Sequence, residues 1–166
     1  MSKKIIEGDV EISSLNIKVI PDFFSDVEIK GMFKCDHNKL LSLRGCPKSV
    51  VEDFICNHNN LTTLEGAPQS VGGDFACAKN QLTTLKGAPQ SVGGNFNCNF
   101  NNLTTLEGAP QSVGRDFICM GNQITTLEGA PRSVGGNFFI EINKVNFTEE
   151  QIRAVCYVKG KIYFKT

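Results

Sequence analysis

The sequence predicts a β-rich repeat solenoid, because its core-type residues recur at a fixed interval of 21 positions with turn signals between them. A phenylalanine opens each of six copies, a cysteine follows two positions later in five of them, an asparagine five later and an aliphatic residue seven later. The phenylalanines are Phe33, Phe54, Phe75, Phe96, Phe117 and Phe138; the asparagines are Asn38, Asn59, Asn80, Asn101, Asn122 and Asn143; the aliphatic residues are Leu40, Leu61, Leu82, Leu103, Ile124 and Val145. Such constant spacing predicts identical units that stack.

Each copy begins with a short strand. Phe75 and Cys77 are two positions apart, so they point to one face of that strand, while Ala76 and Ala78 point to the other. The first face is expected to be core and the second to be free. Asn80 leaves the strand, and we expect its amide to bond the backbone of the neighbouring copy, so that stacked asparagines satisfy groups that would otherwise lack a partner.

The rest of each copy completes the core and returns the chain. Leu82, Leu85 and Val92 fill the remaining core positions, and Gly72-Gly73 supplies the turn into the next strand. One unit cannot bury its own apolar face, so neighbours must stack at about 4.8 Å per strand.

The sequence divides into three segments. Residues 1–32 are an N-terminal cap and degenerate repeat, residues 33–147 the tandem 21-residue repeats, and residues 148–166 a C-terminal cap. In the first segment Val10, Ile12, Ile17, Ile20 and Val27 take core positions, with Leu15 in place of the asparagine. In the last segment Thr148-Glu149-Glu150-Gln151 is typical of a capping box, which predicts a short helix through about Cys156 and a turn at Lys159-Gly160. We expect this segment to close the core.

The Phe-x-Cys-x-x-Asn-x-Leu pattern resembles the central motif of leucine-rich repeats, and the following Thr-x-Leu and Pro-x-Ser-Val segments are similar to the short bacterial type. The resemblance covers roughly residues 10–147. It implies a parallel β-sheet on a concave face and an irregular convex side. The nearly identical Gly-Ala-Pro-Gln-Ser-Val-Gly-Gly units also resemble repeat proteins of bacteriophages, which implies a role in blocking a host protein, such as a component of host defence.

Composition narrows the class of partner. The chain carries 17 basic and 17 acidic residues, so no net charge attracts it to nucleic acid or to an anionic membrane. The start of the sequence lacks the apolar region of a signal peptide, and no stretch is apolar enough for a membrane span. We therefore expect a cytoplasmic protein, in the host cytoplasm if phage-encoded, whose seven cysteines are reduced core residues.

The sequence offers no catalytic motif. No nucleophile elbow, phosphate-binding glycine loop or paired acid motif occurs, and the recurring Gly-Gly pairs are turns. We predict that the protein is not an enzyme and needs no cofactor. The two histidines, His37 and His58, take the same place in adjacent copies, so they are expected side by side; a metal or ligand site there, using Asp36, is an alternative.

Variation between copies is confined to the outward strand positions, which points to a binding face. By strand parity we assign three columns, one, three and four positions after each phenylalanine, to the exposed sheet. The predicted partner-binding residues are Lys34, Asp36, His37, Ile55, Asn57, His58, Lys79, Asn97, Asn99, Phe100, Ile118, Met120, Phe139 and Glu141. Large apolar groups on an exposed sheet are typical of a protein interface when charged residues surround them, as Asp53, Asp74, Asp116, Lys34 and Lys79 do here. Phe100, Ile118, Met120 and Phe139 are the predicted anchors.

The resulting hypothesis is a non-catalytic protein-binding module without nucleic-acid or membrane partners. A structural protein that assembles with further copies of itself is one alternative, because an open end coil or an apolar strip can pair with another copy. A small-ligand or metal-dependent sensor at the histidine pair is the other.

Overall fold

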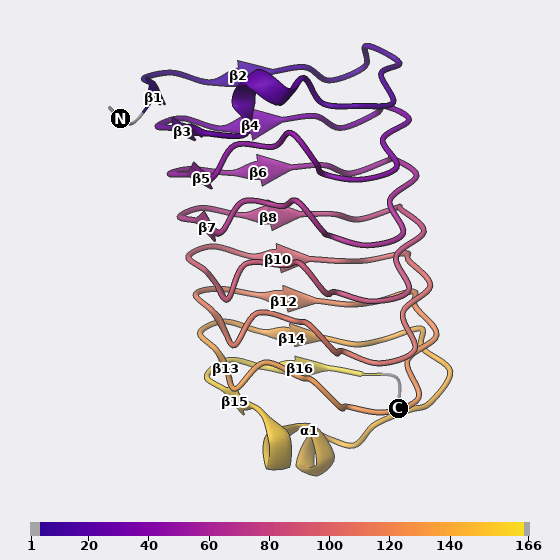
Figure 1. Cartoon of the computed structure of the whole chain (residues 1–166). Helices are drawn as coiled ribbons and strands as arrows, with labels where there is room; N and C mark the ends of the chain where they lie inside the picture. The colour runs from indigo at the N-terminus through magenta and orange to yellow at the C-terminus, as the bar shows by residue number, and fades with distance from the viewer. Residues whose placement is uncertain (1–3, 165–166) are drawn as a thin grey trace.

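The computed structural model describes residues 4–164, which form a stack of eight coils with two parallel sheets (Figure 1). Sheet A contains β1 (Lys4–Ile6), β3 (Val27–Ile29), β5 (Ser49–Val50), β7 (Ser70–Val71), β9 (Ser91–Val92), β11 (Ser112–Val113), β13 (Ser133–Val134) and β15 (Tyr157–Val158). Sheet B contains β2 (Val10–Glu11), β4 (Phe33–Lys34), β6 (Phe54–Ile55), β8 (Phe75–Ala76), β10 (Phe96–Asn97), β12 (Phe117–Ile118), β14 (Phe138–Phe139) and β16 (Ile162–Tyr163). The predicted β-rich solenoid is confirmed.

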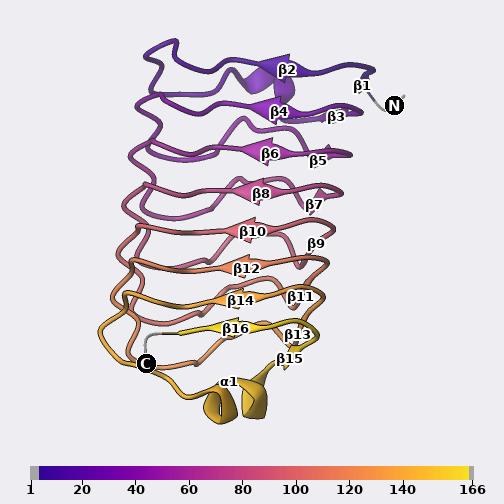
Figure 2. The ribbon, with the colours of Figure 1, turned by 180° about the vertical axis from the view of Figure 1, so that it is seen from behind.

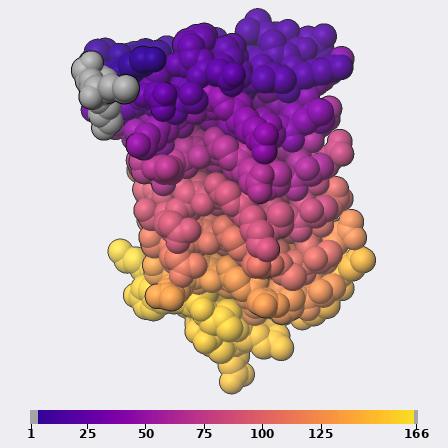
Figure 3. All heavy atoms as spheres, in the orientation of Figure 1, coloured from indigo at the N-terminus to yellow at the C-terminus, as the bar shows by residue number. Residues whose placement is uncertain are grey.

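The register of sheet B follows the 21-residue interval. Phe96 pairs with Phe75 on one side and with Phe117 on the other, always in parallel. The Ser-Val pairs form the second sheet in the same register, with Ser112 opposite Ser91 and Ser133. Seen from behind, the coils keep this order along the whole stack (Figure 2), and in the space-filling view they form consecutive bands of colour (Figure 3). The resemblance to leucine-rich repeats implied one sheet and an irregular convex side. The structure instead has a second parallel sheet, sheet A.

The core is a continuous column of aromatic rings with aliphatic residues beside it. Six repeat phenylalanines stack in sequence with ring centroids 5.0–5.8 Å apart, and each is fully buried. Phe24, in the short 3-10 helix η1 (Asp22–Phe24), closes the N-terminal end of the column by an edge contact with Phe33. The predicted core position of Val145 is wrong: this residue is 40% exposed, because the chain leaves the coil there toward the C-terminal helix, and Phe147 is buried instead.

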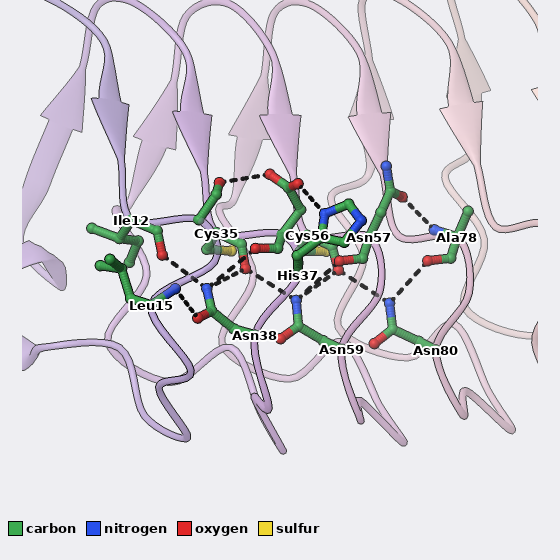
Figure 4. A network of polar contacts seen from close by, with 12 residues as sticks. Ile12, Leu15, Cys35, His37, Asn38, Cys56, Asn57, Asn59, Ala78 and Asn80 are labelled. Atoms are coloured by element: carbon green, nitrogen blue, oxygen red, sulfur yellow. Dashed lines mark hydrogen bonds and ion pairs between the residues drawn. The ribbon is translucent and has the colours of Figure 1, made fainter.

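The predicted asparagine ladder is confirmed (Figure 4). Asn59 donates from Nδ2 to the carbonyls of Cys35, Cys56 and Asn57 at 3.0–3.2 Å, and its Oδ1 accepts the N–H of Leu40 at 3.0 Å. Asn80 repeats this arrangement one coil further on. Each amide thus hydrogen-bonds its own turn to the preceding coil, just beyond the end of the sheet B strand.

All seven cysteines are free and buried, as predicted. Burial raises the pKa of the Cys77, Cys98 and Cys119 thiols well above the usual range, and it raises the pKa of Cys156 to about 11. The three thiols in the repeats donate weakly to carbonyls of the next coil at 3.3–3.5 Å. Their environment is that of core residues.

Both ends of the described chain depart from the 21-residue repeat. Val10 pairs with Phe33, and Ile20 and Val27 are buried. At the other end α1 (Glu149–Val155) begins at Thr148 with both hydrogen bonds of a capping box and buries Ile152. The chain then adds β15 to sheet A and β16 to sheet B, so the C-terminal segment supplies one more strand to each sheet, with α1 beyond them (Figure 1).

A glycine directly follows four of the sheet A strands, β7, β9, β11 and β13, where two coils approach each other closely. A Cβ placed on Gly93 would lie 2.0 Å from the carbonyl oxygen of Gly72, although the backbone of Gly93 is not left-handed. We expect Gly93→Ala to lower the free energy of unfolding by about 1–3 kcal/mol, because the coils must separate to admit one methyl group. Urea unfolding followed by circular dichroism measures this loss.

The matched control for that substitution is Gly8→Ala. No atom lies within 4 Å of a Cβ at Gly8, so the free energy of unfolding should change by less than about 0.5 kcal/mol. Equal stability of the two variants would show that the coils are not held at this separation.

Candidate functional site

The outer face of sheet B carries the three columns of varying residues. Side chains one position after each repeat phenylalanine are half-buried, since each packs against its neighbours in adjacent coils; they are Lys34, Ile55, Ala76, Asn97, Ile118 and Phe139. Those three positions after are also half-buried, apart from the buried Ala78; they are Asp36, Asn57, Asn99, Met120 and Glu141. The strand order places these residues in neighbouring rows along the stack.

The third column contains the residues four positions after each phenylalanine. Its side chains are exposed, but strand parity is not the reason. Strand parity alone would turn the residue four positions after each phenylalanine inward. The backbone is left-handed there in all six repeats, with φ of 52° at His37 and His58, 55° at Lys79 and 53° at Phe100, and these four side chains are exposed. The assignment by parity was therefore wrong for this column, although its exposure is confirmed.

The C-terminal half of the face carries the large apolar side chains among its polar ones. Phe100 is 49% exposed and lies over Gly121: a Cβ on that glycine would be 2.5 Å from the Phe100 ring. Phe139 stacks on Tyr163 with ring centroids 4.4 Å apart and planes within 3°. Ile118 pairs with Phe139 in the sheet, and the Phe100 N–H donates to the Met120 carbonyl at 2.9 Å, so these residues lie in neighbouring coils. We call Phe100, Ile118, Met120, Phe139 and Tyr163 the apolar patch.

Tyr163 was missed by sequence reasoning. It pairs with Phe139 in the last strand of sheet B, but the interval from Phe138 to its partner Ile162 is 24 residues. The helix α1 takes up the additional residues, so a search at a period of 21 does not reach Tyr163. The run Ile162-Tyr163-Phe164 is the one sequence feature that indicates a strand at this place.

The N-terminal half of the face is polar and already hydrogen-bonded. Ser13 donates to Asp36 Oδ1 at 2.7 Å, and Asp36 Oδ2 contacts His37 Nδ1 at 2.6 Å. Burial raises the pKa of Asp36, but the hydrogen bonds from Ser13 and His37 outweigh it and the pKa is lowered. The His37 and His58 rings stack at 4.3 Å. Burial, followed by the charges of His37 and Lys79, lowers the pKa of His58.

The three asparagines of this face, Asn57, Asn97 and Asn99, also accept hydrogen bonds from backbone N–H groups. Asn57 Oδ1 accepts the N–H of Ala78 at 2.7 Å, and Asn99 Oδ1 accepts the N–H of Met120 at 2.8 Å. Asn97 Oδ1 accepts the N–H of Asn99 at 3.1 Å. Their oxygens are therefore occupied, so these residues present mainly amide donors to a partner.

The acidic groups expected at the rim form a second ladder. Asp53 Oδ1 accepts the N–H of Asp74, and Asp116 Oδ1 accepts the N–H of Asn137, both at 2.7 Å. Glu141 differs, because its Oε2 is buried without a hydrogen-bond partner within residues 4–164. It is the acidic member of the face beside the apolar patch.

No family model, curated protein or solved structure matches the chain. Across residues 4–164, no group of three or more His, Cys, Asp or Glu side chains is placed to hold a metal ion. In the same part of the chain neither helix has the length and apolar character needed to cross a bilayer. The fold defines a repeat protein of the parallel β-solenoid class.

Proposed function

We propose that the chain is a non-catalytic protein-binding module whose outer sheet B face engages one protein partner. The observation that carries the proposal is the apolar patch, in which Phe100 is half-exposed and Phe139 is stacked flat on Tyr163. Rigid aromatic anchors on a regular sheet lose little conformational entropy on binding. The polar N-terminal half of the sheet B face would then orient the partner, while the apolar patch would contribute most of the affinity.

The resemblance to leucine-rich repeats of the short bacterial and phage type extends this proposal. It implies a phage-encoded inhibitor that acts in the host cytoplasm by covering a surface of a host protein, such as a defence component. Inhibition by occlusion is stoichiometric and requires no catalytic group. This extension is supported by the repeat motif alone.

The test uses the double variant Phe100→Glu, Phe139→Glu in affinity purification from bacterial lysate. Two buried carboxylates in the centre of an interface should weaken binding by more than about a hundred-fold, because each anchor contributes roughly 2 kcal/mol and the charges add desolvation. A protein captured by the wild type and lost with the variant would identify the partner and the face together.

The control carries the same added charge outside sheet B. Gln90→Glu, Gln111→Glu changes two exposed residues that precede strands of sheet A, and it should leave capture unchanged. Circular dichroism must show both variants folded. Equal capture by all three proteins would contradict the assignment to sheet B.

Self-association is a second candidate, favoured by the N-terminal coil. Ile5, Leu15, Val19 and Phe23 are 45–68% exposed there, beside the outer edges of β1 and β2, which end their sheets. A mass in sedimentation equilibrium that rises with concentration would support this candidate, and a constant mass of 18.1 kDa would exclude it.

A further inference from the structure

Two imidazoles lie together at the polar end of sheet B. His37 and His58 follow β4 and β6 at equivalent positions, and both have φ of 52°. Because the same backbone conformation is repeated in adjacent coils, their rings stack with centroids 4.3 Å apart and planes within 14°. The His37 side chain is 55% exposed, so solvent and ions reach the pair.

One of the two rings is oriented by a chain of contacts from the scaffold. Ser13 donates to Asp36 Oδ1, and Asp36 Oδ2 contacts His37 Nδ1 at 2.6 Å (Figure 4). With Nδ1 engaged by the carboxylate, Nε2 of His37 is the nitrogen left for an outer ligand. A carboxylate behind a histidine is the usual arrangement around metal-bound imidazoles, where it orients the ring and raises its basicity.

We propose that His37 and His58 together bind one divalent transition-metal ion of the Zn²⁺ type, with Asp36 as the positioning residue. Imidazole nitrogen suits Zn²⁺, Cu²⁺ and Ni²⁺ better than Mg²⁺ or Ca²⁺. Two nitrogens bound to one tetrahedral Zn²⁺ at about 2.0–2.1 Å stand about 3.4 Å apart, and the lone pair of each must point at the ion. The lone pairs of two nearly parallel rings point side by side, so the His58 ring must turn out of the stack while Asp36 holds His37. Exposed side chains can make that movement.

The neighbouring charges set the strength of this site. Asp36 attracts a cation, whereas Lys79, the next residue in the column, repels it. Two protein ligands leave the other coordination positions to water or to a side chain of a bound protein. The site is therefore an exchangeable surface site, in contrast to a closed structural site with four protein ligands.

Zinc titration of the full chain tests the proposal, with calorimetry for affinity and NMR for the ligands. The chain has only two histidines, so their imidazole signals are assigned with one single variant. We expect one Zn²⁺ per chain, shifts of both imidazole signals, and a loss of affinity of more than about ten-fold in both His37→Gln and His58→Gln.

Two further variants separate this site from other sources of binding. Asp36→Asn should weaken Zn²⁺ binding by about ten-fold while both imidazole signals still shift, as expected for a residue that acts through His37. Lys79→Gln should bind at least as tightly as the wild type. Unchanged affinity in the double variant His37→Gln, His58→Gln, a shift of only one imidazole signal, or no binding by the wild type would each overturn the proposal.

Discussion

Phe96→Ala is expected to lower the free energy of unfolding by about 3–5 kcal/mol. Phe96 is fully buried and lies in the middle of the aromatic column, with ring centroids 5.3 Å from Phe75 and 5.6 Å from Phe117. Removing this ring leaves a cavity bounded by two other rings, and the strand pairing on both sides resists collapse into it. In a solenoid each coil is stabilised only by its neighbours, so the defect weakens two interfaces between coils.

Chemical denaturation followed by circular dichroism measures this effect, and Phe100→Ala is the control. Phe100 is in the same coil but is 49% exposed, so its truncation should cost less than about 1.5 kcal/mol. A similar loss in both variants would contradict the division into a buried aromatic column and an outer patch. A broad transition in Phe96→Ala alone would indicate that the two halves of the stack unfold separately.

The repeat made most of the fold predictable. Once Phe75 and Phe96 are assigned to equivalent places, the parallel pairing, the stacked rings and the asparagine ladder all follow from the need of identical units to bury the same face. Val92 could be placed in the core by the same reasoning. Its pairing in a second sheet could not, because a two-residue strand has no alternation that reveals it.

The candidate site was less predictable, for two physical reasons. The left-handed backbone at Lys79 and Phe100 has no sequence signal, because in that column only Gly121 and, more weakly, the two histidines favour positive φ. Tyr163 joins the apolar patch through a coil that α1 lengthens, so it falls outside the period. Parity and periodicity describe regular strands, and the surface contributed by turns and ends depends on tertiary structure.

Asn80→Ala is expected to lower the free energy of unfolding by about 2–3 kcal/mol. The amide is 9% exposed, and its Oδ1 accepts the N–H of Leu61 at 3.1 Å. That N–H loses its partner in the variant, and an unsatisfied buried donor costs about 1–3 kcal/mol. The carbonyls of Cys56 and Cys77 are affected less, because Asn59 and Asn101 still donate to them.

Gln81→Ala is the control, because this neighbouring side chain is exposed and its loss should change the free energy of unfolding by less than about 0.5 kcal/mol. Asn80→Asp then separates the two roles of the amide. It keeps an acceptor for Leu61, but places carboxylate oxygen 3.1 Å from the carbonyls of Cys56 and Cys77, where Nδ2 now donates. Burying that charge against two acceptors should cost more than Asn80→Ala does. If Asn80→Asp were the milder change, the ladder would be stabilised by its acceptors alone, and the donor side of the asparagine would be dispensable.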